Sequence, residues 1–404
     1  MERLCHARVC GGQPGVRVAM LIWDYWPGRE GGAQRQCRKL TRALAALGVE
    51  CAVLTQRYSR RAPPTEDDAG ARIVRLGRLA PLFEIGLRWR ARGLKPTVPW
   101  LWLGRLSFAG AAAGWLRREA PGLDALHAHE SHWLGGFAAW LGAGAGLPAV
   151  CKEATYPPLP RVGRDVPLAG RWRAWRLRPH FIAQHAAAAE ALAAAGVPRE
   201  RLHVIPNGVE LPAETARPRA GGEVLCVSNF RQGAAWKGFD VLLGAWARVA
   251  RARPEARLTL LGAGDSAPWQ ALAQRLGCVG SVRFAGFAPD PAAYYRQAAV
   301  FVLPSRIEGL SNALLEAQSW GLPAVVSDIP GYGAAIRDGE NGLTTPAGDE
   351  AALAAALLRL IGDANLRARL GAAARARAAA EFDIRRVAAA TLALYRRLAE
   401  ERRP

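Results

Sequence analysis

Apolar runs that predict buried strands alternate with helix-forming runs along this chain, in two separate series. The first series places strands at residues 16–22, 50–55, 72–76, 125–129, 148–151 and 202–205; the second places them at 223–227, 257–261, 282–285, 300–303 and 323–327. Strands separated by helices pair in parallel through βαβ crossovers. We therefore expect an α/β fold of two doubly wound, Rossmann-like domains that face each other across a cleft.

The length of 404 residues also favours two domains, because a single hydrophobic core rarely grows that large. Residues 1–15 lack a strand pattern and are expected to form a loose extension. The N-terminal domain spans 16–205, and 206–222, rich in proline and glycine, form a linker. The C-terminal domain spans 223–384. Residues 385–404 are expected to form a helix that packs back on the N-terminal domain.

The formal net charge is +20, and residues 1–205 carry 30 basic and 15 acidic side chains. Two interpretations stay open. One is a bias toward arginine codons, because only four basic residues are lysine. The other is attraction to an anionic membrane surface. Segments 87–106 and 171–176 mix arginine with tryptophan, which suits a lipid headgroup zone as well as an ordinary helix face. No nucleic-acid-binding module is recognisable, so we expect no nucleic-acid partner.

Cysteine use and hydropathy bear on location. The seven cysteines are scattered, without a C-x-x-C pair, which favours reduced, mostly buried thiols over a disulfide framework or a zinc site. The sequence contains no charge-free apolar run of 18 residues, and its first residues do not resemble a signal peptide. We expect a cytoplasmic protein, with peripheral attachment to the inner face of the membrane as the second interpretation of the charge.

Two carboxylates eight residues apart, Glu308 and Glu316, are the strongest chemical signal. Glu308 lies in a glycine-containing loop after a predicted strand, and Glu316 lies in the helix that follows. Ser311 is a suitable N-cap for that helix, whose first N–H groups then point at a site for an anion. A carboxylate near a sugar and N–H donors near a diphosphate are what glycosyl transfer from a nucleotide sugar requires. Two solvated glutamates are the alternative on spacing alone.

Two cations follow the first strand of the second series, Arg231 and Lys237. Fixed cations at the end of a strand can neutralise a leaving diphosphate without a metal ion. The alternative is that both are ordinary surface residues.

The stretch from Pro304 to Ala317 resembles the E-x7-E signature of retaining glycosyltransferase family 4, which has the GT-B fold. Ile205–Val209 and Asp338–Leu343 resemble two further motifs of that family, so the resemblance extends over most of the chain. It implies a metal-independent transferase that needs no cofactor and retains the anomeric configuration of a nucleotide diphosphate sugar. The acceptor would be a glycan, a lipid-linked sugar or a small molecule.

The resemblance also assigns site residues. Glu308 and His129 would be catalytic, flanking the sugar, and no metal ligand is implied. The donor-binding residues would be Arg231, Lys237, Glu316, Ser311, Asn312, Gly309, Leu310, Gly31, Gly32, Gly264 and Phe287. Two departures from the family pattern stand out. Arg231 comes two residues later than the usual arginine, and the glutamate that many members carry shortly after Gly331 is absent here.

Two other functions stay in view. A non-hydrolysing sugar-nucleotide epimerase has the same architecture, but it needs additional acids that are not evident in the sequence. A catalytically inactive sugar-binding protein would not be expected to keep Glu308, Glu316 and Lys237 together.

Overall fold

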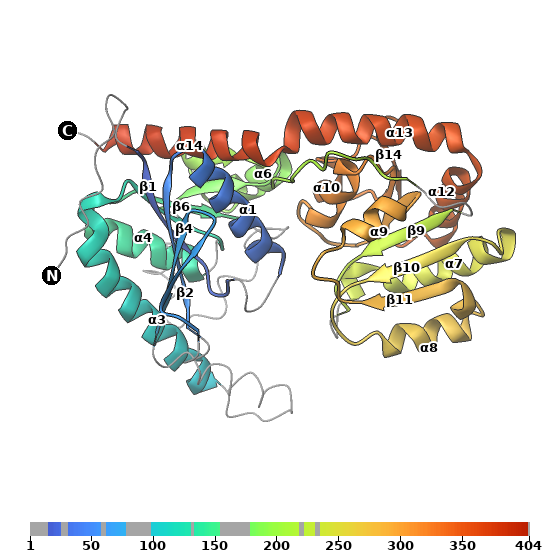
Figure 1. Ribbon diagram of the computed structural model, residues 1–404, viewed down its shortest axis with the longest axis horizontal. Coiled ribbons are helices and arrows are strands. Elements are labelled where there is room, and N and C mark those ends of the chain that lie inside the picture. Colours follow the sequence, from blue (N-terminus) through green and yellow to red (C-terminus); the bar gives the residue numbers. More distant parts are fainter. Residues whose placement is uncertain are drawn as a thin grey trace. The chain divides into compact units, whose positions relative to one another are not determined.

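The computed structural model describes residues 15–25, 31–57, 62–77, 98–130, 133–153, 178–217, 222–230 and 235–402, with side chains omitted at 98–102. The chain divides into two compact units (Figure 1). The first comprises Met1–Lys152, Gly170–His180 and Ala388–Pro404, and the second comprises Glu153–Ala169 and Phe181–Val387.

The first sheet has the strand order β3-β4-β2-β1-β5-β6-β7-β8. Its strands are β1 (Arg17–Leu21), β2 (Glu50–Gln56), β3 (Thr65–Asp68), β4 (Ala71–Leu76), β5 (Ala125–Ala128), β6 (Ala149–Lys152), β7 (His180–Ala183) and β8 (Leu202–Val204). β3 is antiparallel to β4, whereas β1 is parallel to both β2 and β5. The central strands are apolar and closed to water, with Val18 and Met20 fully buried, which is typical of a parallel sheet covered on both faces.

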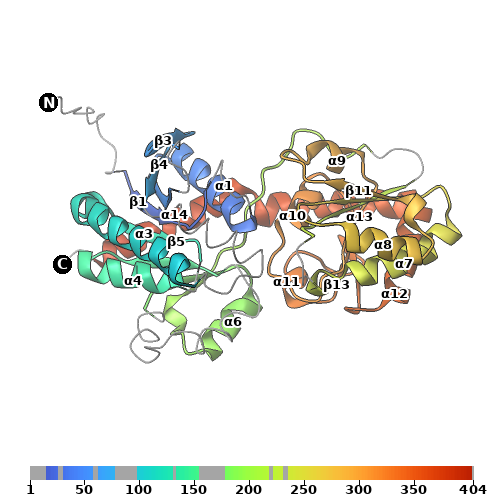
Figure 2. The same ribbon diagram turned by 90° about the horizontal axis from the view of Figure 1, so that it is seen from below.

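The helices of the first unit lie on opposite faces of this sheet. α1 (Gly32–Ala46) follows β1 on one face, and α3 (Val98–Glu119) and α4 (Trp133–Ala145) lie on the other (Figure 2). The chain moves from β1 to β2 in one direction and from β5 to β6 in the other. Because each crossover is right-handed, the reversal of direction moves the helices to the opposite face.

The second sheet has the strand order β11-β10-β9-β12-β13-β14, and its neighbouring strands pair in parallel. Its strands are β9 (Glu223–Val227), β10 (Arg257–Leu261), β11 (Val282–Gly286), β12 (Val300–Leu303), β13 (Ala324–Ser327) and β14 (Gly342–Thr345). The helices associated with this unit are α6 (Ala186–Ala194), α7 (Phe239–Ala252), α8 (Ala267–Arg275), α9 (Ala292–Gln297), α10 (Asn312–Ser319), α11 (Pro330–Gly333), α12 (Glu350–Gly362) and α13 (Ala364–Arg377).

Short 3-10 turns and a long last helix complete the chain. The turns are η1 (Ala120–Gly122), η2 (Arg199–Arg201), η3 (Ala235–Lys237) and η4 (Val279–Ser281), and η5 (Ala378–Phe382) is a π-helical turn. α14 (Ile384–Glu401) begins in the second unit, and its residues from Ala388 onward belong to the first. Tyr395 of this helix is fully buried in the first unit, where its hydroxyl meets His127.

The expected α/β fold of two doubly wound, parallel-sheet units is confirmed. Three strands were not predicted: β3, β7 and β14. β3 reads Thr-Glu-Asp-Asp and has no apolar alternation, so its strand conformation depends on its pairing with β4. The boundaries expected for the domains and the linker stay predictions.

Candidate functional site

The strand order of the second sheet reverses once, between β9 and β12. β9, β10 and β11 follow one another outward in one direction, and β12, β13 and β14 follow in the other. Ligands of open parallel sheets bind beyond the carboxyl ends of the strands at such a reversal. The loops that follow β9 and β12 are therefore the place in this unit where a ligand site is expected.

Lys237 and Glu308 meet beyond these two strand ends. The ammonium group of Lys237 forms an ion pair with Oε2 of Glu308, and the two side chains are 19% and 23% exposed. Each is shielded from bulk water and still open to a ligand. The pair places a donor suited to an anion beside an acceptor suited to hydroxyl groups.

Arg306 fixes the two loops that carry this pair. Its guanidinium donates to both carboxylate oxygens of Asp240, at 2.9 and 2.7 Å, and its backbone N–H donates to the Trp236 carbonyl at 2.6 Å. Gly238 has a positive φ of 69°, and a Cβ there would lie 2.0 Å from the Pro304 carbonyl oxygen. Only glycine permits so close an approach of the two backbones.

Helix α10 begins where the sequence predicted. Ser311 is its N-cap, and the Ser311 hydroxyl accepts from the Leu314 N–H at 3.5 Å. Glu316 lies on the helix and accepts a hydrogen bond from the Tyr295 hydroxyl at 3.1 Å. The N-cap position of Ser311 is confirmed, and Glu308 and Glu316 lie on the loop and the helix that were expected to hold them.

Two side chains that sequence reasoning missed hold the loop between Glu308 and α10. Nδ2 of the buried Asn207 donates to the Leu310 carbonyl at 2.9 Å and to Oδ1 of Asn312 at 3.1 Å. Oε1 of the buried Gln184 accepts from the Leu310 N–H at 2.9 Å. The sequence marks Asn207 only as part of the family-like stretch Ile205–Val209 at the start of the expected linker, and no sequence signal marks Gln184.

The loop after β10 packs on the loop after β9. Gly264 has a φ of 118°, and a Cβ there would lie 2.4 Å from the Phe230 carbonyl oxygen. The Ala263 N–H donates to Oδ1 of Asn229 at 3.2 Å. Phe287, just beyond β11, is 52% exposed, which leaves an aromatic face open on the same edge of the sheet.

The first sheet reverses its strand order between β1 and β5, and His129 directly follows β5. His129 is buried and stacks on His127 with ring centroids 4.4 Å apart, while its Nε2 lies 3.4 Å from Sδ of Met20. Burial, together with the positive charge of nearby Lys152, lowers the pKa of His129 to about 3. Burial also lowers the pKa of His127 well below its usual range. Both imidazoles are therefore neutral at neutral pH.

Gly31 and Gly32 open α1 near the same reversal. Gly31 is the N-cap, has extended backbone and supplies no side-chain cap, so the first N–H groups of α1 have no cap from that residue. Arg231 lies outside the described residues, and so do most of segment 87–106 and all of 171–176.

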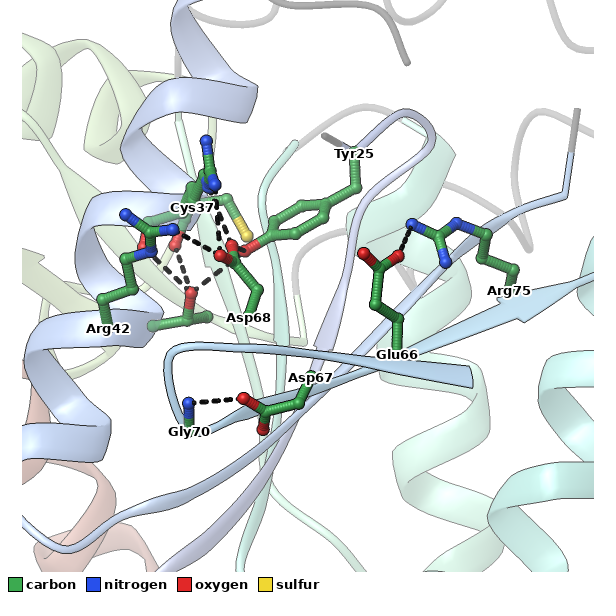
Figure 3. A network of polar contacts seen from close by, with 10 residues as sticks. Tyr25, Cys37, Arg42, Glu66, Asp67, Asp68, Gly70 and Arg75 are labelled. Atoms are coloured by element: carbon green, nitrogen blue, oxygen red, sulfur yellow. Dashed lines mark hydrogen bonds and ion pairs between the residues drawn. The ribbon is translucent and has the colours of Figure 1, made fainter. Parts of the chain in front are cut away.

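A polar network anchors α1 to β3 (Figure 3). Asp68 accepts from Nε of Arg38 at 2.7 Å, from a guanidinium nitrogen of Arg42 and from the Tyr25 hydroxyl at 3.3 Å. Burial opposes ionisation of Asp68, but the hydrogen bonds from both arginines outweigh it and lower the carboxyl pKa. The network fixes the helix that starts at Gly32.

Comparison with known proteins decides the family. A model described as Glycosyltransferase Family 4 matches residues 30–212, and one described as Glycosyl transferases group 1 matches residues 221–363. The chain is 30% identical over 397 residues to a D-inositol 3-phosphate glycosyltransferase of Thermomonospora curvata, with 86% of each chain covered. The chain belongs to the GT-B glycosyltransferases. It is also 29% identical to a glycogen synthase of Mycobacterium tuberculosis over 94% of each chain.

A solved structure agrees with the fold of this glycosyltransferase. The structure of HepE from Anabaena in complex with UDP superposes with a TM-score of 0.68 at 18% identity, covering 94% of this chain and 100% of that chain. The family assignment corresponds to the resemblance drawn from the motif around Glu308.

Two expectations about this glycosyltransferase concern features outside the site. The five described cysteines (Cys37, Cys51, Cys151, Cys226 and Cys278) are free and buried, as expected for them. Within the part of the chain that the structure describes, no helix combines the length and the apolar character needed to cross a bilayer. Attachment to a membrane surface and a cytoplasmic location stay predictions.

Proposed function

We propose that this glycosyltransferase takes a sugar from a nucleotide diphosphate sugar bound by its second unit and transfers it with retention of configuration, without a metal ion. The observation that carries the proposal is the Lys237–Glu308 pair at the strand reversal of the second sheet. HepE, which has the same fold, was solved with UDP, and this supports a nucleotide-bearing donor.

The chemistry follows from where charge develops. As the bond between C1 and the phosphate oxygen breaks, negative charge builds on the diphosphate and positive charge on the sugar ring. Lys237 would meet the diphosphate, together with Arg231 and the first N–H groups of α10 after Ser311. Glu308 would hold sugar hydroxyls and face the positive ring, and Glu316 would accept from the ribose hydroxyls.

The other proposed contacts come from the remaining loops. Gly309, Leu310 and Asn312 would line the diphosphate and sugar, and Gly264 and Phe287 would border the base. From the first unit, His129 would present a neutral imidazole to the sugar, and Gly31 and Gly32 would approach the donor with their backbone. A glycan and an inositol phosphate are named in the relatives, so we propose a hydroxyl-bearing glycan, lipid-linked or small-molecule acceptor.

The epimerase alternative is no longer retained. Both family models and the two curated relatives belong to transferases, and no observation on the described residues favours epimerisation.

A donor screen tests the proposal. Thermal unfolding is measured with UDP-, GDP- and ADP-sugars, since a ligand at 100 times its dissociation constant stabilises the folded state by about 2.7 kcal/mol. We expect one nucleotide class to raise the unfolding midpoint and the other two to leave it unchanged. Absence of a shift with all three would contradict a nucleotide-sugar donor. With a working donor, NMR of the product anomer tests retention, and turnover after EDTA treatment tests metal independence.

A further inference from the structure

Two buried hydroxyl groups lie beside the Glu308 loop. Ser305 and Tyr332 are both fully buried, and no well-formed hydrogen bond satisfies Oγ of Ser305 or Oη of Tyr332 among the described residues, although the two hydroxyls lie close enough to interact with each other. A buried hydroxyl without a partner costs free energy, so such groups are rare in folded proteins and need a reason. Here both lie at the carboxyl edge of the second sheet, after β12 and β13.

The backbone brings the segment that carries Tyr332 against the Glu308 loop. A Cβ at Gly331, the preceding residue, would lie 2.3 Å from the Glu308 carbonyl oxygen and 2.5 Å from that of Gly309. Helix α11 is therefore pressed against the Glu308 loop with no side chain between them. This is also the segment where the glutamate that many family members carry is missing; the run after Gly331 reads Tyr332-Gly333-Ala334-Ala335.

Electrostatics agrees with that placement. Burial raises the pKa of the Tyr332 phenol well above its usual range, the Glu308 carboxylate raises it further, and the Ser305 hydroxyl acts in the opposite direction. Tyr332 therefore stays protonated, which makes it a permanent hydrogen-bond donor next to a carboxylate.

We propose that Tyr332 and Ser305 are positioning residues that hold the Glu308 carboxylate once the donor occupies the site. This inference rests on the proposed function. In the free protein Lys237 pairs with Glu308. When Lys237 turns to the diphosphate of the donor, Glu308 loses that partner and accepts from the two hydroxyls instead.

The test measures the effect of each variant on binding of the sugar separately from its effect on binding of the diphosphate. Calorimetric titration of wild type, Tyr332→Phe and Ser305→Ala uses UDP-glucose, GDP-mannose and ADP-glucose, each with its free nucleoside diphosphate. Because Glu308 faces the sugar, each variant should weaken binding of the nucleotide sugar about tenfold and leave binding of the free diphosphate unchanged. Tyr294→Phe is the matched control, because the half-buried Tyr294 ring lies under the Arg283 guanidinium and is not among the proposed donor contacts, so it should change neither constant.

A double-mutant cycle shows whether the effect passes through Glu308. In a Glu308→Ala background, Tyr332→Phe should produce no further change in the ratio of the two dissociation constants. A purely structural role would lower thermal stability and leave that ratio unaltered, whereas loss of an unpaired hydroxyl should leave the unfolding midpoint unchanged or raise it. The inference is overturned if both single variants leave the ratio of the two dissociation constants unaltered. It is also overturned if Tyr332→Phe changes that ratio equally in the Glu308→Ala background. Absence of binding of every probe to the wild type overturns the proposed function itself.

Discussion

The two sheets carry opposite chemistry at equivalent positions. Beyond the strand reversal of the first sheet lie two stacked, buried imidazoles, His127 and His129, that are neutral at neutral pH. Beyond the reversal of the second sheet lies a charged pair, Lys237 and Glu308, in which each side chain is about one-fifth exposed. The strand reversal therefore carries buried, neutral imidazoles in one unit and a partly exposed ion pair in the other.

The difference follows from how far along the chain each residue lies from the end of its strand. His129 comes one residue after β5 and remains packed beside Met20 of β1, so desolvation dominates its chemistry. Glu308 comes five residues after β12, in a loop, and its partly exposed side chain pairs with Lys237. A fixed charge suits an anionic ligand, and a neutral imidazole suits hydroxyl groups.

The largest effect is expected from removing the charge of Glu308. Glu308→Gln keeps the shape of the side chain but removes the carboxylate that we propose faces the developing positive ring, so kcat/KM should fall about 100-fold or more. The measurement is transfer, or hydrolysis of the nucleotide sugar where no acceptor is supplied. Glu255→Gln, at an exposed ion pair with Arg253, is the control and should be silent. Turnover within a few-fold of wild type would remove Glu308 from the catalytic role.

Lys237→Met tests the ionic site of the second unit, because it removes the positive charge of the Lys237–Glu308 pair. Loss of one charge-assisted contact to the diphosphate should weaken binding of the free nucleoside diphosphate about 30-fold, and the remaining affinity should depend less on salt. Titration at two ionic strengths measures both. Lys39→Met on α1 is the matched control. Equal salt dependence in wild type and Lys237→Met would mean that Lys237 does not contact the diphosphate.

The sequence was sufficient for the parts that depend on local patterns. Apolar runs located most strands, and loop–helix spacing located Glu308, Ser311 and Glu316. The alternation of strands and helices also implied that loops far apart in the chain meet at one edge, as Lys237 and Glu308 do.

Long-range contacts explain what the sequence did not reveal. Gln184 reaches the Leu310 N–H from a segment 126 residues earlier, and no local pattern marks that pairing. The burial of His129 beside Met20 likewise depends on the packing of β1 against β5, so its lowered pKa followed only from the structure. The sequence marked the segment after Gly331 as a departure from the family pattern, but the approach of that segment to the Glu308 loop is visible only in the structure.

The buried, neutral His129 of the first unit predicts that the protein loses folding stability in acid. The pKa of His129 in the folded state, about 3, lies below its unfolded value of about 6.5, so the unfolded chain binds the extra proton between these values. Folding stability therefore falls as pH drops through 6.5, by about 2 kcal/mol at pH 5 from this imidazole. Denaturant unfolding at pH 7 and pH 5 measures it, and His129→Phe should show a smaller decline. Equal declines would mean that His129 is solvated.

The smallest effect is expected in the polar network that anchors α1 to β3. Two adjacent aspartates there, Asp67 and Asp68, differ in their surroundings (Figure 3). Asp68 is buried between two arginines, whereas the exposed Asp67 accepts from the exposed Gly70 N–H. Asp68→Asn should lower the free energy of unfolding by about 1 kcal/mol, because both arginines are partly exposed and screened. Asp67→Asn should be silent.

The pH dependence of that difference identifies its cause. The folded pKa of Asp68 is lowered, so the ionised carboxylate stabilises the fold above its unfolded pKa of about 3.9, and this stabilisation is lost as pH falls through the folded value. Wild type and Asp68→Asn should therefore differ in unfolding free energy at pH 7 and converge below about pH 4. A difference in unfolding free energy that persists in acid would show that Asp68 acts through packing. The position of α1 in the first unit would then depend on packing rather than on charge.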